Sequence, residues 1–175
     1  CTGGVGCTAG TDPCGGAGCD EGTDTCLGGT PEIWMSFTSA ATIPGVGTVA
    51  NEDIVAYNPS SGLWSMVFDG SDVGISALTI DGMAVLPGGD ILLSFSSTGS
   101  IPGLTGSPDG TTNANFSDIV RFTPTLLGGT TTGAFSFYFD GSDVGMDSTG
   151  ENTDAITLAS DGRLILSTSG SAALT

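Results

Sequence analysis

Aspartate residues recur at matched positions in a sequence that repeats itself. The heptapeptide Phe-Asp-Gly-Ser-Asp-Val-Gly occurs at residues 68–74 and again at 139–145, and matching segments flank both copies in the same order. Carboxylate and carbonyl oxygens that converge in Gly-containing turns are the ligands that Ca²⁺ prefers. The matched aspartates are therefore predicted calcium ligands, and they are Asp53, Asp69, Asp72, Asp81, Asp118, Asp140, Asp143 and Asp154.

The charge balance favours a bound cation at these turns. The net charge is −17, and the only basic side chains are Arg121 and Arg163, because the chain has no Lys and no His. Neighbouring carboxylates repel one another, and so few protein cations cannot neutralise them. The alternative is that Asp and Ser in the Asp-Gly-Ser-Asp turns bond to the local backbone, which would explain one aspartate in each turn. The twelve-residue spacing with a terminal Glu is missing, so the motif is not an EF-hand.

The composition excludes several functional classes. Phosphate backbones and anionic lipids attract Lys and Arg, so we expect neither nucleic-acid binding nor docking on anionic membranes. No apolar run approaches the roughly 18 residues that would predict a transmembrane segment. Without His or Lys the chain lacks an imidazole base and a Schiff-base lysine, so we do not expect an enzyme. A carboxylate pair for glycoside hydrolysis is the one chemistry left open, on weak grounds.

The cysteines are confined to the N-terminal part of the chain. All of them lie between Cys1 and Cys26, among Gly, Thr, Asp and Pro. A segment with so little to bury needs covalent links, and the spacing lacks the C-x₂-C pair of a zinc site. We predict disulfides among Cys7, Cys14, Cys19 and Cys26, and hence an extracellular or cell-surface location. Five cysteines leave one unpaired, and we interpret Cys1 as bonded to a cysteine upstream in a longer chain or on a neighbouring subunit, with lipid modification or a free thiol as alternatives.

The internal duplication extends beyond the heptapeptide. Asp53-Ile54-Val55 matches Asp118-Ile119-Val120, and residues 80–95 match 153–168, which aligns Asp81 with Asp154. A partial copy, residues 33–45, matches 91–103. We therefore expect a Cys-rich segment at 1–30 and a duplicated domain at 31–175. This domain divides into a first, partial repeat (32–79), a second, full repeat (80–145) and a third, partial repeat (146–175), as in a window from a longer array or a unit whose ends complete one another in an assembly.

The local pattern predicts an all-β fold. Runs rich in β-branched and aromatic residues alternate with Gly, Pro, Asp and Ser, and no window has convincing helical periodicity. In the full repeat we expect four strands, at 80–86, 91–96, 119–122 and 135–139, with a Pro-Gly-Gly-Asp turn between the first two. Duplicated four-stranded antiparallel units would form a β-sandwich or an open propeller-like stack.

The repeated strings resemble tandem modules of large secreted bacterial surface proteins. The resemblance rests on "DIVRF", on the Trp-Ser pair before "FDGSDVG", on "DGRLILS", and on the spacer "GTDPCGGAGCDEGTDTC". It covers residues 32–169 and the spacer. The pair is Trp64-Ser65 in the first repeat but Phe135-Ser136 in the second, so a role for the indole ring is not carried over. The resemblance implies an extracellular, repetitive and non-catalytic role.

Two functions follow from these features. The first is a structural repeat module that associates with copies of itself into a surface filament, sheath or stalk, stabilised by Ca²⁺ and disulfides. The alternative is a calcium-dependent adhesin that binds glycans by stacking on Trp34, Trp64, Tyr57 and Tyr138. We expect Trp64 and Tyr138 to pack in the core, which favours the structural function.

Modification by glycans is a further expectation for a chain of this composition. Asn115-Phe116-Ser117 is an N-glycosylation sequon. The predicted O-glycosylation sites are Thr111, Thr112, Thr130, Thr131 and Thr132.

Overall fold

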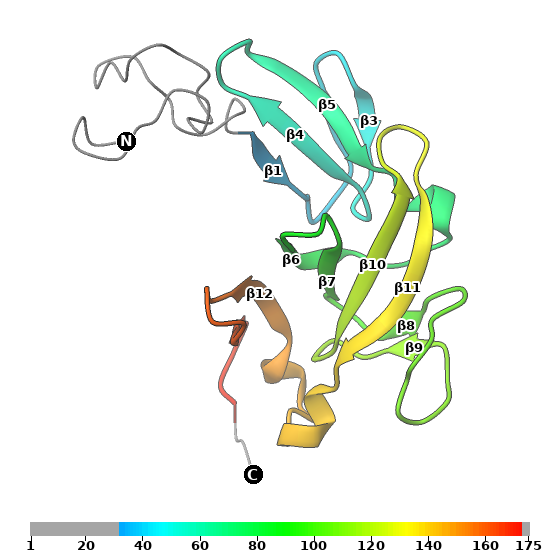
Figure 1. Ribbon diagram of the computed structural model, residues 1–175, viewed down its shortest axis with the longest axis vertical. Helices are drawn as coiled ribbons and strands as arrows, with labels where there is room; N and C mark the ends of the chain where they lie inside the picture. The colour runs from blue at the N-terminus through cyan, green and yellow to red at the C-terminus, as the bar shows by residue number, and fades with distance from the viewer. Residues whose placement is uncertain (1–31, 173–175) are drawn as a thin grey trace, which may run out of the picture.

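Short antiparallel strands make up the part of the chain that the computed structural model describes, residues 32–172 (Figure 1). This part is all-β, with three short 3-10 helices and no α-helix, and it holds no helix suited to crossing a bilayer. The predicted Cys-rich segment and its cysteines lie outside it. The strands are β1 (Ile33–Met35), β2 (Ala41–Ile43), β3 (Gly47–Val49), β4 (Ile54–Asn58), β5 (Leu63–Phe68), β6 (Ile80–Val85), β7 (Ile91–Phe95), β8 (Gly99–Ser100), β9 (Asn113–Ala114), β10 (Ile119–Leu126), β11 (Thr132–Phe139), β12 (Thr153–Leu158) and β13 (Leu164–Thr168). The 3-10 helices are η1 (Ser71–Val73), η2 (Gly141–Val144) and η3 (Thr149–Glu151).

The strands form three main sheets and two small hairpins. The strand orders of the sheets are β1-β4-β5, β11-β10-β7-β6 and β12-β13, and the hairpins are β2-β3 and β8-β9. Every named pair is antiparallel, so the sheets are built from hairpins and meanders. In Figure 1 the three-stranded sheet lies at the top, β10 and β11 run down the right side, and β12 lies below β6 and β7.

The expected strands of the second repeat are present, with different lengths. The first two end one residue earlier than predicted, whereas β10 and β11 extend through Leu126 and begin at Thr132. The extension follows from pairing, since Thr123 lies opposite Ala134 and Pro124 opposite Gly133 in a long hairpin. Pro124 and Gly133 weaken the strand signal of these segments, but cross-strand neighbours stabilise the pairing.

A register shift occurs at the same place in both heptapeptide-containing repeats. It falls between Ile54 and Val55 on β4, and between Ile119 and Val120 on β10. A β-bulge bends its strand and re-aims the side chains around it. Ile54 and Val55 belong to different hydrophobic clusters, and so do Ile119 and Val120, because successive side chains along a strand point to opposite faces of the sheet.

The main core lies between the three-stranded and four-stranded sheets. Phe68 from β5 meets Phe122 from β10 edge-on, with ring centroids 5.1 Å apart, and the ring centroid of Phe135 from β11 lies 4.9 Å from that of Phe122. Aromatic pairs in such offset arrangements add to the free energy of burial. The rings hold the first repeat against the second.

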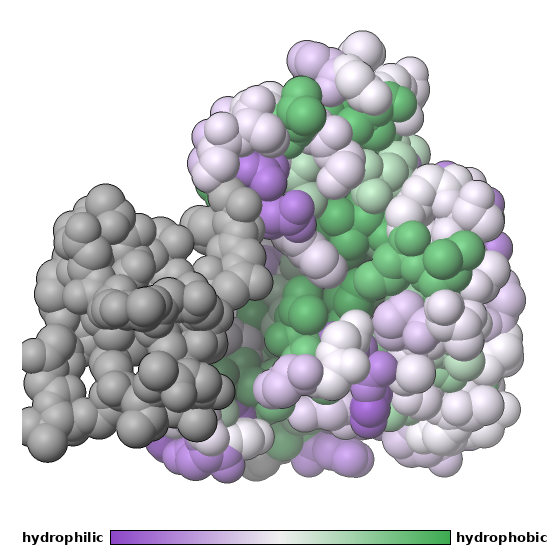
Figure 2. All heavy atoms as spheres, turned by 45° about the horizontal axis from the view of Figure 1, so that its top comes forward, coloured by the Kyte–Doolittle hydropathy of each residue, from purple (hydrophilic) through white to green (hydrophobic). Residues whose placement is uncertain are grey.

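The far face of the four-stranded sheet is covered by β12 and β13. Leu92 and Ile119 pack there with Ile156. Gly82 on β6 permits the close approach, because a Cβ at this position would lie 3.3 Å from the Cα of Ala155. The Ser94 hydroxyl donates a 2.7 Å hydrogen bond to the Thr153 carbonyl across the same interface. Figure 2 shows hydrophobic residues gathered in the middle of one face, with more polar residues above and below.

Phe122→Ala should lower the free energy of unfolding by about 3–5 kcal/mol, because it leaves a cavity between two aromatic rings in a side-chain position that is 0% exposed. Leu63→Ala is the matched control, because Leu63 is 68% exposed and its truncation should change stability by less than about 0.5 kcal/mol. Urea denaturation of both variants provides the measurement. Equal effects would show that the aromatic cluster is not the main core.

Candidate functional site at the Asp-Gly-Ser-Asp turns

Both heptapeptides fold into the same strand-to-turn structure. A short 3-10 helix, η1 or η2, directly follows the strand that carries the heptapeptide phenylalanine, β5 or β11. Each helix ends at a glycine in the left-handed region, Gly74 with φ 79° and Gly145 with φ 80°. Only glycine adopts this conformation without steric cost, so the final glycine of each heptapeptide fixes the end of the turn.

A buried carboxylate holds each turn in place. Asp118 is 3% exposed, and its Oδ1 accepts a 3.0 Å hydrogen bond from the Gly141 amide while Oδ2 accepts one of 2.7 Å from the Asn115 amide. Asp53 does the same in the first repeat, with the amides of Gly70 at 3.0 Å and Ala50 at 2.8 Å. Each aspartate therefore links the loop before one strand to the turn after the next strand. We call each such aspartate with its two backbone hydrogen bonds a clamp.

Glycine at the clamped position is required by the packing. A Cβ at Gly70 would collide with the Glu52 carbonyl oxygen, and one at Gly141 would collide with Ser117. The Asp-Gly step of the heptapeptide therefore has a physical cause, because only a residue without a side chain can bring its amide to the buried carboxylate.

The first aspartate of each heptapeptide bonds within its own turn. Asp69 Oδ1 accepts hydrogen bonds from the Ser71 amide at 3.1 Å and the Ser71 hydroxyl at 2.7 Å. Asp140 Oδ1 accepts from the Ser142 amide at 2.9 Å and hydroxyl at 2.6 Å. These are the local turn bonds that the sequence offered as the alternative to calcium. In both cases only one carboxylate oxygen is used in these bonds.

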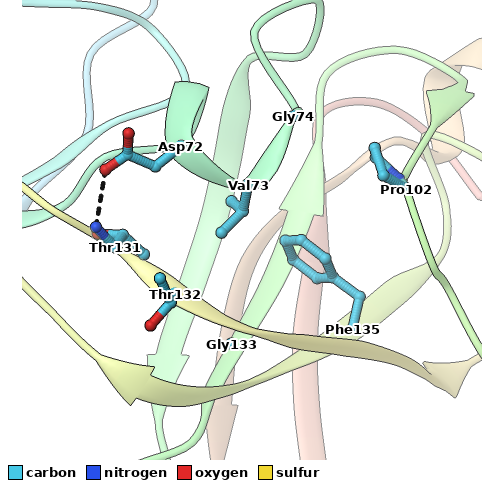
Figure 3. Close-up of a pocket in the computed structure, with 8 residues that line it drawn as sticks. All are labelled: Asp72, Val73, Gly74, Pro102, Thr131, Thr132, Gly133 and Phe135. Atoms are coloured by element: carbon cyan, nitrogen blue, oxygen red, sulfur yellow. Dashed lines mark hydrogen bonds between the residues drawn. The ribbon is translucent and has the colours of Figure 1, made fainter.

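The second aspartate of the first heptapeptide reaches a different repeat. Asp72 Oδ2 accepts a 2.8 Å hydrogen bond from the Thr131 amide (Figure 3). The Asp69 amide donates to the Thr131 hydroxyl at 2.9 Å. The Gly128 amide donates to the Val67 carbonyl at 2.7 Å beside them. We call this set of contacts the seam. It joins the end of β5 to the loop between β10 and β11, and so connects the first repeat to the second.

A groove of about 410 Å³ opens at the seam. Figure 3 shows Val73 and Phe135 projecting toward it, with Pro102 on its far side and the Asp72–Thr131 bond at its near end. Binding of one calcium ion by Asp69 and Asp72 together would require both carboxylates to turn toward one point. In the structure, Asp69 bonds to Ser71 and Asp72 bonds to Thr131.

Carboxylates from different parts of the chain do approach one another. Burial raises the pKa of Asp118, backbone hydrogen bonds from Asn115 and Gly141 oppose the rise, and the charges of Asp140 and Asp109 add to it. These three aspartates line a cavity of about 100 Å³. No group of three or more acidic, His or Cys side chains within residues 32–172 has an arrangement suited to a metal ion.

Burial and neighbouring carboxylates also raise the pKa of two other acidic side chains, Glu52 and Asp81. Burial raises the pKa of Glu52, its own backbone hydrogen bond opposes the rise, and the charges of Asp53 and Asp69 add to it. For Asp81 burial is again the largest cause of a raised pKa, a hydrogen bond from Asn152 opposes it, and the charge of Asp154 contributes. Six of the eight predicted ligands are therefore near enough to another carboxylate for the charges to interact. The other two, Asp72 and Asp143, are both exposed, and Asp72 bonds to the Thr131 amide.

Sequence reasoning missed several residues of this region. Glu52 is buried beside Asp53. Thr131 forms two seam bonds, since its amide donates to Asp72 and its hydroxyl accepts from the Asp69 amide. Arg121 forms an ion pair with the buried Asp90, through Nε at 2.6 Å and through its terminal nitrogen. The adjacent position of Glu52 and Asp53 was visible in the sequence, but no local pattern connects Thr131 with a turn that lies so much earlier in the chain.

The predicted glycan-related residues have mixed environments. Asn115, Thr111, Thr112, Thr130 and Thr132 are exposed, whereas Thr131 is buried and its hydroxyl donates to the Gly128 carbonyl. Among the proposed stacking aromatics, Tyr57 and Trp64 are half-buried with ring centroids 4.8 Å apart, and Trp34 is also half-buried. Tyr138 differs from the expected core position, since it is 37% exposed.

Comparison of the chain with models of protein families, with curated proteins and with solved structures gives no match. The assignment of a function therefore depends on the chain's own geometry.

Asp118→Asn should lower the free energy of unfolding at neutral pH by about 1–3 kcal/mol, because the amide group leaves one of the two backbone donors without an acceptor. Asp147→Asn, an exposed aspartate with the same change in charge, should shift stability by less than about 0.5 kcal/mol. Chemical denaturation at pH 7 gives both values.

The pH dependence provides a second result from the same pair of variants. The folded-state pKa of Asp118 is raised above its ordinary value of 3.8, so the folded chain binds this proton more tightly than the unfolded chain does. The stability gained from protonation of Asp118 is complete below pH 3.8 and is lost as the pH rises through the raised pKa, whereas the two hydrogen bonds to its carboxylate remain at neutral pH. Asp118→Asn should remove this part of the pH dependence, and Asp147→Asn should keep it. An Asp118→Asn variant as stable as the parent at neutral pH would contradict the clamp.

Proposed function

We propose that this chain is an extracellular structural repeat module that assembles with copies of itself into a surface filament, sheath or stalk. The observation that carries the proposal is the seam, where one repeat holds the next through the Asp72–Thr131 bond and the Val67–Gly128 bond. A contact between successive repeats that is written into a repeated motif can be used again at every further repeat. This is how solenoid and array proteins are built.

The arrangement of the sheets supports a stacked architecture within this proposal. The strand order β6-β7-β10-β11 is an antiparallel meander, as in a propeller blade, and its two faces pack against β4-β5 on one side and β12-β13 on the other. We propose that the repeats form an open, propeller-like stack. Each four-stranded unit would then be sandwiched between its neighbours, and the three-stranded and two-stranded sheets would be parts of such units.

The side chains favour a structural role over a catalytic or glycan-binding one. The sequence has neither His nor Lys, and the carboxylates of both turns are used in hydrogen bonds that fix the backbone. Three of the four aromatics considered for sugar stacking are half-buried, two of them against each other. Rings that contribute to packing in this way stabilise the fold rather than offering a free face to a sugar.

We also propose that Ca²⁺ stabilises the module at the carboxylate pairs. Asp140 lies near the buried Asp118 and has one carboxylate oxygen outside its turn bonds, and Asp154 lies near Asp81. With a net charge of −17, a divalent cation would offset repulsion that two arginines cannot. Water and carbonyl oxygens would complete the six to eight ligands that Ca²⁺ takes.

Sedimentation velocity of the full, disulfide-intact chain in calcium-containing buffer tests the assembly. The sedimentation coefficient should rise with protein concentration, and electron microscopy of the same samples should show elongated particles. Removal of calcium with EGTA should lower the melting temperature of the chain. EGTA that is already saturated with calcium is the control and should leave the melting temperature unchanged. Monomers at every concentration would overturn the proposed function.

A matched pair of variants tests calcium separately. Asp140→Asn keeps the Oδ1 acceptor that bonds to Ser142 and removes only the charge, so the calcium-dependent rise in melting temperature should shrink. Asp147→Asn should leave it unchanged. A melting temperature that is the same with calcium and with EGTA would reject the calcium proposal and leave the assembly proposal standing.

A further inference from the structure

The second repeat presents, uncovered, the face that the first repeat uses at the seam. Alignment of the two heptapeptides relates Val67 to Tyr138, Asp72 to Asp143 and Val73 to Val144. Val67 is 9% exposed and is part of the main core, and Val73 packs against this core. Tyr138 and Val144 are each 37% exposed, whereas Val73 is half-buried. Asp143 is exposed, as Asp72 is. We call Tyr138, Asp143 and Val144 the shelf.

Asp143 adopts the same backbone position as Asp72. Its helix η2 begins after β11 as η1 does after β5, and the closing glycines have the same left-handed conformation. In the first repeat that position brings the aspartate to the amide of Thr131 from the next repeat. The shelf therefore corresponds to the β5 side of the seam. Residues 32–172 contain no second loop that would correspond to the other side.

One strand of the third repeat has an edge that pairs with no other strand in residues 32–172. β13 corresponds to β7 in the alignment that matches Asp81 with Asp154, and β7 pairs with β6 on one side and β10 on the other. Among the described strands, β13 pairs with β12 alone. An edge strand of this kind can pair with a further strand through its free N–H and C=O groups.

One element performs both tasks in the second repeat. The hairpin β10–β11 pairs with β7 along its strand, and the loop at its far end forms the seam with the first repeat. The chain therefore shows which element covers such an edge and such a shelf together. Its features are an Asp-Ile-Val strand, a Gly-Gly-Thr-Thr loop and an aromatic strand.

We propose that the shelf and the free edge of β13 form one docking site for a β-hairpin of the β10–β11 kind, supplied by a further repeat. This inference rests on the proposed function and deepens it by naming the partner. The hairpin binds by strand addition to β13, and its loop amide donates to Asp143 as Thr131 donates to Asp72. Its apolar side chains cover Tyr138 and Val144.

A chain extended at its C-terminus tests the site with the full protein. Thr175 corresponds to Pro102 in the same alignment of Asp154 with Asp81, so a second copy of residues 103–146 placed after Thr175 continues the repeat in register. Hydrogen exchange measured by NMR should show that the amides of β13 not bonded to β12 exchange at least about tenfold more slowly, because they now open only with the docked hairpin. The NMR signals of the Tyr138 ring should shift as the ring is covered.

Two controls make the result specific. An extension with the same residues in scrambled order should leave β13 exchange unchanged. In the extended chain, Tyr138→Ser should reduce the added protection, whereas Leu63→Ser, which removes another exposed apolar side chain, from β5, should preserve it.

Equal amide exchange rates for β13 in the original and extended chains would overturn the docking site. An equal loss of protection in the Tyr138→Ser and Leu63→Ser variants would overturn it as well. Docking in the extended chain is intramolecular, so it does not require association between molecules. Protection without self-association would therefore support this inference and reject the proposed filament, and self-association without protection would do the reverse.

Discussion

A buried carboxylate that accepts two backbone amides is the interaction on which the rest of this structure depends. Asp53 and Asp118 each draw a glycine amide and a loop amide to a single side chain, at 2.7–3.0 Å. Hydrogen bonds to an ionised group are stronger than those between neutral groups, and a buried backbone donor without a partner is costly. The carboxylate therefore fixes the end of the strand pair, and with it the direction in which the turn points.

The turn direction decides how repeats meet. Once the glycine is clamped, the short helix places its second aspartate beyond the sheet, and in the first repeat this side chain reaches the loop of the next repeat. The aromatic cluster of Phe68, Phe122 and Phe135 supplies the apolar part of the same contact. A polar clamp inside one repeat and an apolar contact between repeats thus act together, so that a chain with few charged side chains can still position its sheets.

The parts of the fold that depend on local sequence were predictable. The hairpin around the Pro-Gly-Gly-Asp turn was found to within one residue, because turn residues and β-branched runs act over short distances. The importance of the matched aspartates was also visible, but their partners were not. The sequence shows that Asp53 and Asp118 occupy matched positions, but it does not show which groups they bind. Their hydrogen bonds to backbone amides depend on a loop and a turn that the sheet brings together. Thr131 and the exposure of Tyr138 depend on contacts between repeats, which a single repeat's pattern does not encode.

Amide hydrogen exchange at Gly70 and Gly141 tests the central claim most directly. Both amides donate to a buried aspartate, so both should exchange with the slow rates of the core strands and at similar free energies of opening. The amide of Gly106, in an exposed loop, supplies the fast reference in the same spectrum. Exchange of Gly70 and Gly141 as fast as that of Gly106 would show that the carboxylates do not hold the turns, and the account of repeat stacking would fail with it.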